Sequence, residues 1–187
     1  MVNIAVFASG TGSNFEAIVN HQSMVYNVVL LVCDNENAKV IKRAELLDIP
    51  TLVINPKNYK SKALYEQVIC NTLTKLNIQF IVLAGYMRLI GQVLLSAYPG
   101  KIINIHPSLL PSFKGLDALG QALKAGVKMT GVTIHYVDEG MDTGKIIAQD
   151  SLLIHADESR EQIEQRIHAI EHRMYPKTIE KAIKESL

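Results

Sequence analysis

The chain has 187 residues, of which 48% are hydrophobic, so it can bury one core of ordinary size and has no room for a second domain. Its 19 basic and 18 acidic residues nearly cancel and form no run of like charge, which disfavours binding to nucleic acid or to a membrane and favours small-molecule chemistry. Cys33 and Cys70 lie far apart and outside any CxxC pair, which argues against a disulfide framework or a zinc site.

Short apolar runs alternate with helix-like stretches from the N-terminus to residue 105. The first run is too short for a secretion signal or a membrane span, so we expect a cytoplasmic protein. The runs are rich in β-branched residues and predict buried strands over residues 2–8, 27–32, 51–54, 80–84 and 102–105. The stretches between them predict helices over residues 14–19, 38–47, 62–76 and 91–98. This order predicts a Rossmann-like, mostly parallel sheet with helices on both faces.

The pattern changes in the C-terminal part of the chain. Residues 130–137 and 145–154 predict two strands joined by the loop 138–144, which would add antiparallel strands to the sheet. After Asp157, apolar residues recur at helical spacing, and Pro176 is expected to kink or divide that helix. We therefore predict one α/β domain over residues 1–187, with three layers in the order helix, sheet, helix.

The first predicted strand is followed by a glycine-rich loop, residues 9–14. Backbone amides at the start of the next helix would make this loop an anion site, suited to a phosphate. A third glycine at position 15 is replaced by Phe15, and no Walker Lys-Ser/Thr pair is present, so NAD and ATP are both disfavoured. Asp34, where an NAD enzyme would bind ribose, is then not decisive. The alternative is structural, because Ser13 and Glu16 have the spacing of a capping box.

Asn104 and His106 lie two positions apart at the end of a predicted strand, so their side chains should project together. Pro107 keeps the chain extended at the edge where open α/β sheets bind ligands. An Asn amide and an imidazolium are the donors that a tetrahedral oxyanion needs, and Asp142 in the following Asp/Gly loop could hold the imidazole. The alternative is that both side chains only satisfy backbone groups at a strand end.

Several segments share their order and spacing with one known family. They are SGTGSN (9–14), LAGYMRLI (83–90), NIHPSLLP (104–111), MDTG (141–144) and EHRMYP (171–176). With these segments the chain resembles the phosphoribosylglycinamide formyltransferases over nearly its whole length. The resemblance implies transfer of the formyl group of 10-formyltetrahydrofolate to the amine of N1-(5-phosphoribosyl)glycinamide in purine (IMP) biosynthesis. It implies no metal and no covalent enzyme intermediate.

The resemblance also assigns roles to residues. It implies a phosphoribosyl-binding half, 1–100, and a catalytic and folate-binding half, 101–187. The catalytic residues would be Asn104, His106 and Asp142. The residues binding glycinamide ribonucleotide would be Gly12, Ser13, Asn14 and Glu171, to which we add His168, one helical turn earlier, as a phosphate ligand. The folate-binding residues would be Lys62, Met87, Arg88, Leu89, Ile90, Asn104 and Asp142.

Two positions depart from the family pattern, and one histidine stays open. Lys62 stands where many members carry Arg, so it would lose the bidentate fork toward the folate. Asp117 stands where His is frequent and could shift the pH optimum. His135 alternates with apolar residues, so it either faces the pocket or packs as a structural histidine.

Related formyl-folate enzymes are the nearest alternatives. Formyltetrahydrofolate hydrolase and methionyl-tRNA formyltransferase share the Asn-x-His and Asp chemistry but normally carry a further domain, which this chain is too short to hold. Near-neutral charge also disfavours tRNA. A non-catalytic nucleotide-binding module is the alternative from another class, and the retained trio Asn104, His106 and Asp142 speaks against it. The sequence leaves open whether the protein is a monomer or a homodimer.

Overall fold

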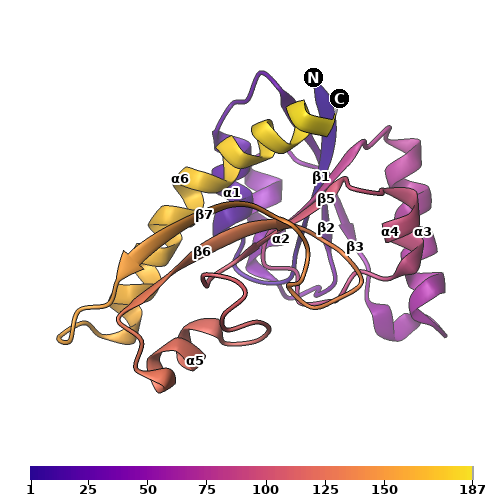
Figure 1. The fold of residues 1–187 in the computed structure, drawn as a ribbon. Helices are drawn as coiled ribbons and strands as arrows, with labels where there is room; N and C mark the ends of the chain where they lie inside the picture. The colour runs from indigo at the N-terminus through magenta and orange to yellow at the C-terminus, as the bar shows by residue number, and fades with distance from the viewer. Residues whose placement is uncertain (187) are drawn as a thin grey trace.

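A seven-stranded sheet runs through the computed structural model, which describes residues 1–186 (Figure 1). Its strand order is β3-β2-β1-β4-β5-β6-β7. The strands are β1 (Val2–Ala8), β2 (Tyr26–Cys33), β3 (Thr51–Val53), β4 (Phe80–Leu83), β5 (Ile102–His106), β6 (Met129–Tyr136) and β7 (Ile146–Leu153). β1 to β5 pair in parallel, and β6 and β7 continue the sheet antiparallel. The predicted mixed sheet is thereby confirmed.

Helices cover both faces of this sheet. They are α1 (Ser13–Asn20), α2 (Lys39–Leu46), α3 (Lys62–Lys75), α4 (Gln92–Ala97), α5 (Ala118–Ala125) and α6 (Arg160–Ser186), with a short 3-10 turn η1 (Pro56–Asn58). One apolar core packs α1, α2 and α6 against one face, and a second packs α3 and α4 against the other. Figure 1 shows α3 and α4 on the opposite side of the sheet from α6. The three predicted layers are confirmed.

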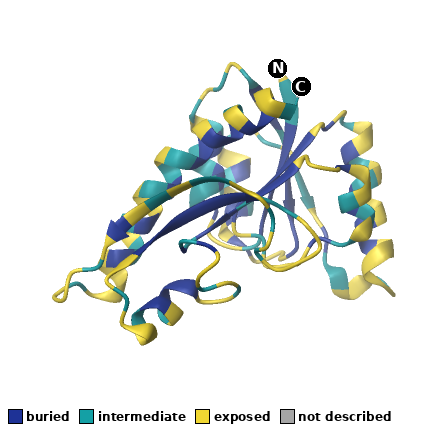
Figure 2. Ribbon diagram, viewed as in Figure 1, coloured by how far each residue is buried: buried dark blue, intermediate teal, exposed yellow. Residues whose placement is uncertain are grey.

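The central strands are apolar on both faces because both faces are covered. In β1, residues 4–8 are all fully buried, and their side chains alternate between the two cores. Figure 2 shows the buried central strands between half-exposed helices. Half of the residues of the edge strand β7 are exposed, as expected for a strand with only one covered face.

Two features of the C-terminal part differ from expectation. α5 is not predicted by the sequence pattern; Asp117 caps its first turn by accepting a hydrogen bond from the Gly120 amide at 3.2 Å. The expected division at Pro176 is wrong, since α6 runs unbroken through it. Pro176 and the neighbouring Tyr175 are buried against the sheet, and this packing outweighs the one helical hydrogen bond that proline removes.

The strand order predicts where a ligand-binding crevice opens. The chain builds outward from β1 to β2 and β3, then returns to the other side of β1 to form β4. Loops after β1 and β4 therefore diverge, and such a switch point opens a crevice at the carboxyl ends of the strands. No helix within residues 1–186 combines the length and apolarity needed to cross a membrane.

Candidate active site

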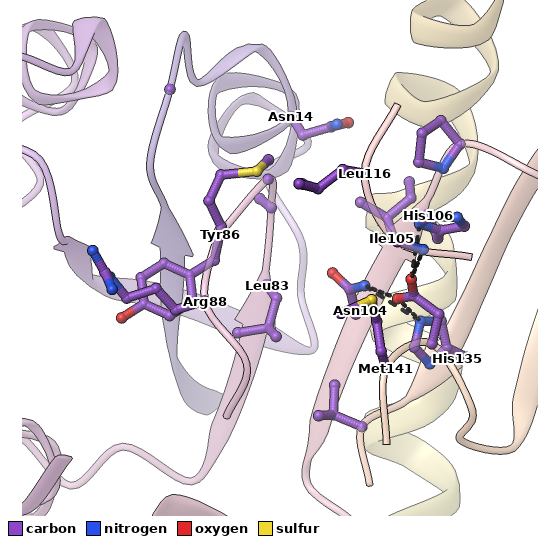
Figure 3. Close-up of a pocket in the computed structure, with 18 of the residues that line it drawn as sticks. Asn14, Leu83, Tyr86, Arg88, Asn104, Ile105, His106, Leu116, His135 and Met141 are labelled. Atoms are coloured by element: carbon purple, nitrogen blue, oxygen red, sulfur yellow. Dashed lines mark hydrogen bonds and ion pairs between the residues drawn. The ribbon is translucent and has the colours of Figure 1, made fainter. Parts of the chain in front are cut away.

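A cavity of about 480 Å³ lies at the carboxyl edge of β1, β4 and β5. This volume is within the range typical of small-molecule sites. Its walls come from the loop after β1, residues 83–90 around the end of β4, residues 104–107, the segment 115–117, the loop 137–142 and two residues of α6. Figure 3 shows Asn104, His106 and His135 gathered on one side, with Tyr86 and Arg88 across from them.

Asn104 and His135 meet because they are paired across β5 and β6. The antiparallel register sets them directly opposite, so both side chains face the cavity. The Asn104 Nδ2 atom lies 3.3 Å from His135 Nε2 and 3.5 Å from Asp142 Oδ1. His135 Nδ1 donates to the carbonyl of Tyr136 at 2.8 Å, which leaves Nε2 facing the site. His135 is thus buried, and it also lines the cavity with its Nε2 toward Asn104 and Asp142.

His106 is held by the segment that follows its own strand. Its Nε2 lies 2.8 Å from the carbonyl oxygen of Phe113, and because a carbonyl only accepts, Nε2 carries a proton and donates. The other ring nitrogen, Nδ1, lies 3.5 Å from Asp142 Oδ2. A second proton on His106 would therefore face Asp142.

Asp142 is the point at which these groups converge. Its Oδ2 accepts a hydrogen bond from the Gly115 amide at 2.8 Å, and its Oδ1 lies 3.6 Å from His135 Nε2. Burial by itself would raise the pKa of Asp142, but the His135 ring, the Gly115 amide and the charge of His106 outweigh it, so the pKa is lowered. Within residues 1–186, no three His, Cys, Asp or Glu side chains are grouped so as to hold a metal ion.

The loop after β1 presents backbone amides at the start of α1. Gly12 has φ +81°, and a Cβ there would lie 2.5 Å from Val40, so only glycine fits. The capping box expected of Ser13 and Glu16 is not formed among the described residues: Gly12 is the N-cap, and Glu16 pairs with Arg43. The first amides of α1 are thereby left uncapped by side chains of residues 1–186 beside the cavity.

Asn14, His168 and Glu171 form a second polar group on the cavity wall. The nearly buried Glu171 carboxylate accepts from Asn14 Nδ2 and from His168 Nδ1, each at 2.9 Å. The hydrogen bond to Glu171 raises the pKa of His168. The structure thus brings Asn14, His168 and Glu171 together, although Glu171 is 157 positions from Asn14 in the chain.

Met87, Arg88, Leu89 and Ile90 all line the cavity, as expected of a folate segment. Lys62 does not. It starts α3 and lines a neighbouring cavity with Tyr59 and Tyr65, and the two cavities share only residues 86–90. The role of Lys62 as a folate contact stays a prediction, and the contact would be made from the neighbouring cavity across the shared 86–90 segment.

Asp117 also lines the cavity, but its negative charge is balanced by an ion pair with Arg160. Arg160 at the start of α6 binds it, with Nη2 at 2.6 Å from Oδ1, and this hydrogen bond lowers the pKa of Asp117. The Phe113 carbonyl and the Gly115 amide, which hold His106 and Asp142, are not predicted by the sequence. Backbone groups of an irregular loop leave no signature in the pattern of side chains.

Known proteins are similar to this chain in sequence and in fold. The family model "Formyl transferase" matches residues 2–179. A phosphoribosylglycinamide formyltransferase of Bacillus subtilis (strain 168) is 56% identical over 186 residues, 98% of this chain and 95% of the relative. The trifunctional purine biosynthetic protein adenosine-3 of Gallus gallus is 37% identical over 182 residues, 96% of this chain but 18% of that protein. The crystal structure of phosphoribosylglycinamide formyltransferase from Bacillus halodurans is 49% identical, with a TM-score of 0.95 over 99% of this chain and 97% of that one. The chain belongs to the formyl transferase family.

Proposed function

We propose that this protein transfers the formyl group of 10-formyltetrahydrofolate to the amine of N1-(5-phosphoribosyl)glycinamide, a step of purine biosynthesis. The main support for this proposal is that Asn104, His106 and His135 all lie close to the ionised Asp142. The other walls of the same cavity suit a phosphate and a folate. The relative from B. subtilis bears the name of this activity and matches nearly the whole chain. Cys33 and Cys70, both free thiols, suit a reducing cytoplasm.

The substrate would lie between the start of α1 and α6. The amides of Gly12, Ser13 and Asn14 can bind its phosphoribosyl end, and the raised pKa of His168 favours a cation that a phosphate would attract. Glu171 can accept hydrogen bonds from the glycinamide amine. The same carboxylate is already bonded to Asn14, which fixes where the amine would be held.

The folate would lie along residues 87–90, with its formyl group toward Asn104 and Asp142. Met87, Leu89 and Ile90 give this segment an apolar side for the aromatic part of the donor, and Arg88 gives it a cation. Lys62 would meet only a part of the donor that extends beyond Arg88, since it lines the neighbouring cavity.

In the reaction, the neutral amine attacks the formyl carbon and the carbonyl oxygen becomes an oxyanion. Asn104 Nδ2 and His106 Nδ1 each lie 3.5 Å from an oxygen of Asp142, so neither donor is strongly bonded to it. Both donors would instead form hydrogen bonds to the formyl oxygen as its negative charge develops. An oxyanion beside the carboxylate of Asp142 is favourable only if His106 carries the second proton. The C–N10 bond then breaks, and the amine proton passes to N10 of tetrahydrofolate.

Purified protein mixed with 10-formyltetrahydrofolate and glycinamide ribonucleotide should change the folate absorbance and yield the formylated ribonucleotide. His106→Ala should lower kcat by about 10²–10³, the usual cost of one oxyanion donor. His155→Ala is the matched control, because His155 is exposed and outside the cavity, and it should keep full turnover. Formate in place of the formylated product would favour a hydrolase, and full turnover by His106→Ala would exclude the proposed chemistry.

A further inference from the structure

Asp34 carries a buried carboxylate that the reaction above does not use. It follows β2 directly, is 9% exposed, and lines neither cavity. Its Oδ1 accepts from the Ser9 hydroxyl at 2.5 Å, and its Oδ2 accepts from Arg88 Nε at 2.6 Å. Both oxygens of Asp34 are thus bonded to protein groups, so it is not arranged as a ribose ligand.

These contacts join the two binding segments across the switch point of the sheet. Ser9, which follows β1, accepts the Met87 amide at 2.9 Å while it donates to Asp34. The Ser9 amide in turn donates to the carbonyl of Gly85 at 3.1 Å. Asp34 therefore anchors the start of the glycine loop and residues 85–88 to the same point.

Arg88 is held at one end and exposed at the other. Its Nε is bonded to Asp34, whose side chain is 6% exposed, while the Arg88 side chain is 43% exposed and lines both cavities. A guanidinium fixed through Nε keeps its two terminal nitrogens in a planar fork, which matches the two oxygens of a carboxylate. Holding the fork in advance reduces the conformational entropy that ligand binding would cost.

We propose that Asp34 is a positioning residue for the formyl donor: it aims Arg88 at the glutamate carboxylate of 10-formyltetrahydrofolate. This inference rests on the proposed function, because it requires a folate along residues 87–90. The formyl group lies at the pterin end of the donor and the carboxylates at the other. Asp34 therefore acts on binding of the donor and not on the chemical step.

The test compares 10-formyltetrahydrofolate with 10-formyltetrahydropteroate, which lacks the glutamate. Asp34→Asn removes the negative charge and leaves one acceptor oxygen in place of the two that bind Ser9 and Arg88, so Arg88 is held more weakly. KM for the complete donor should rise about tenfold, as for the loss of one hydrogen bond to a charged group, and KM for the truncated donor should change less than twofold. The preference between the two donors should therefore fall, with kcat changing much less than KM.

Two further variants keep the test decisive. Arg88→Lys keeps the charge but not the fork, and should lose the same preference even if Asp34→Asn folds poorly. Asp150→Asn is the matched control: Asp150 pairs with Arg173 at 2.5 Å, outside both cavities, and its loss should leave the preference unchanged.

The outcomes separate this inference from the proposed function. If the wild type turns over both donors and Asp34→Asn and Arg88→Lys keep its preference, Asp34 has no positioning role. An equal rise of KM for both donors would show general distortion and would also overturn the role. If the wild type turns over neither donor, the proposed function itself fails.

Discussion

Asp142 stands between two histidines and one backbone amide, and that environment decides its charge. Burial alone would raise the pKa of this carboxylate, yet His135, the Gly115 amide and His106 together lower it. The backbone of Asp142 adopts a left-handed conformation, with φ +53°, in the loop between β6 and β7. Its ionisation is thus built by three separate segments of the chain.

This lowered pKa predicts how stability depends on pH. The pKa of Asp142 is lower in the folded state than in the unfolded state, where it is about 4. Its contribution to the free energy of unfolding is therefore fully present above about pH 4 and is lost as the pH falls through the lower folded pKa. Asp142→Asn lacks this titration. The difference in free energy of unfolding between wild type and variant, measured in urea, should change in disfavour of the wild type as the pH falls below about 4. A difference that stays constant down to pH 3 would contradict the lowered pKa.

Individual site residues were predictable where their side chains carried the signal. Alternation along a strand placed Asn104 and His106 on one face, and the same alternation left His135 open until the register showed it opposite Asn104. The sequence does not show that Lys62 lines a second cavity, because a position at the start of a helix does not say which side of a neighbouring loop the helix lies on. The sequence leaves Asp34 without a role, since its partner Arg88 is 54 positions away.

At the scale of elements, α6 supplies side chains to the cavity and also packs against the sheet. Its first turns carry Arg160, His168 and Glu171 to the cavity side, and its middle is buried. Periodicity predicted this helix, but local rules suggested a break at Pro176 that tertiary packing overrides. By contrast, α5 is short and depends on the Asp117 cap, so hydrophobic spacing alone did not reveal it.

Tyr175 shows how α6 fixes the ends of the strands. Its ring is fully buried, and its hydroxyl donates to the carbonyl of Leu83 at 2.7 Å, where β4 ends. Tyr175→Phe keeps the ring but leaves that buried carbonyl without this donor, so the free energy of unfolding in urea should fall by about 1–3 kcal/mol. Tyr98→Phe is the control, because the Tyr98 hydroxyl makes a longer bond, 3.3 Å, to Ile78. An equal or larger loss in Tyr98→Phe would contradict this role of Tyr175.

At the scale of the whole molecule, the N-terminal and C-terminal halves of the chain share one sheet. β4 and β5 lie on either side of residue 100 and pair directly, with Ile81 opposite Ile102 and Leu83 opposite Asn104. The core under α1, α2 and α6 likewise contains buried residues from both halves, among them Phe15 and Ile179. Neither half can therefore bury its apolar surface without the other.

This shared core predicts cooperative unfolding of residues 1–100 and 101–187. Hydrogen exchange followed by mass spectrometry in increasing urea should show the most protected amides of β1 and of β5 opening with the same free energy, because both strands face the same core. A substitution confined to the second half, Tyr175→Phe, should lower the protection of β1 amides by the same amount as that of β5 amides. If β1 instead kept its protection while β5 lost it, the two halves would be separate folding units, and the cavity walls from residues 10–14 and 83–90 could then move relative to Asn104, His106 and Asp142.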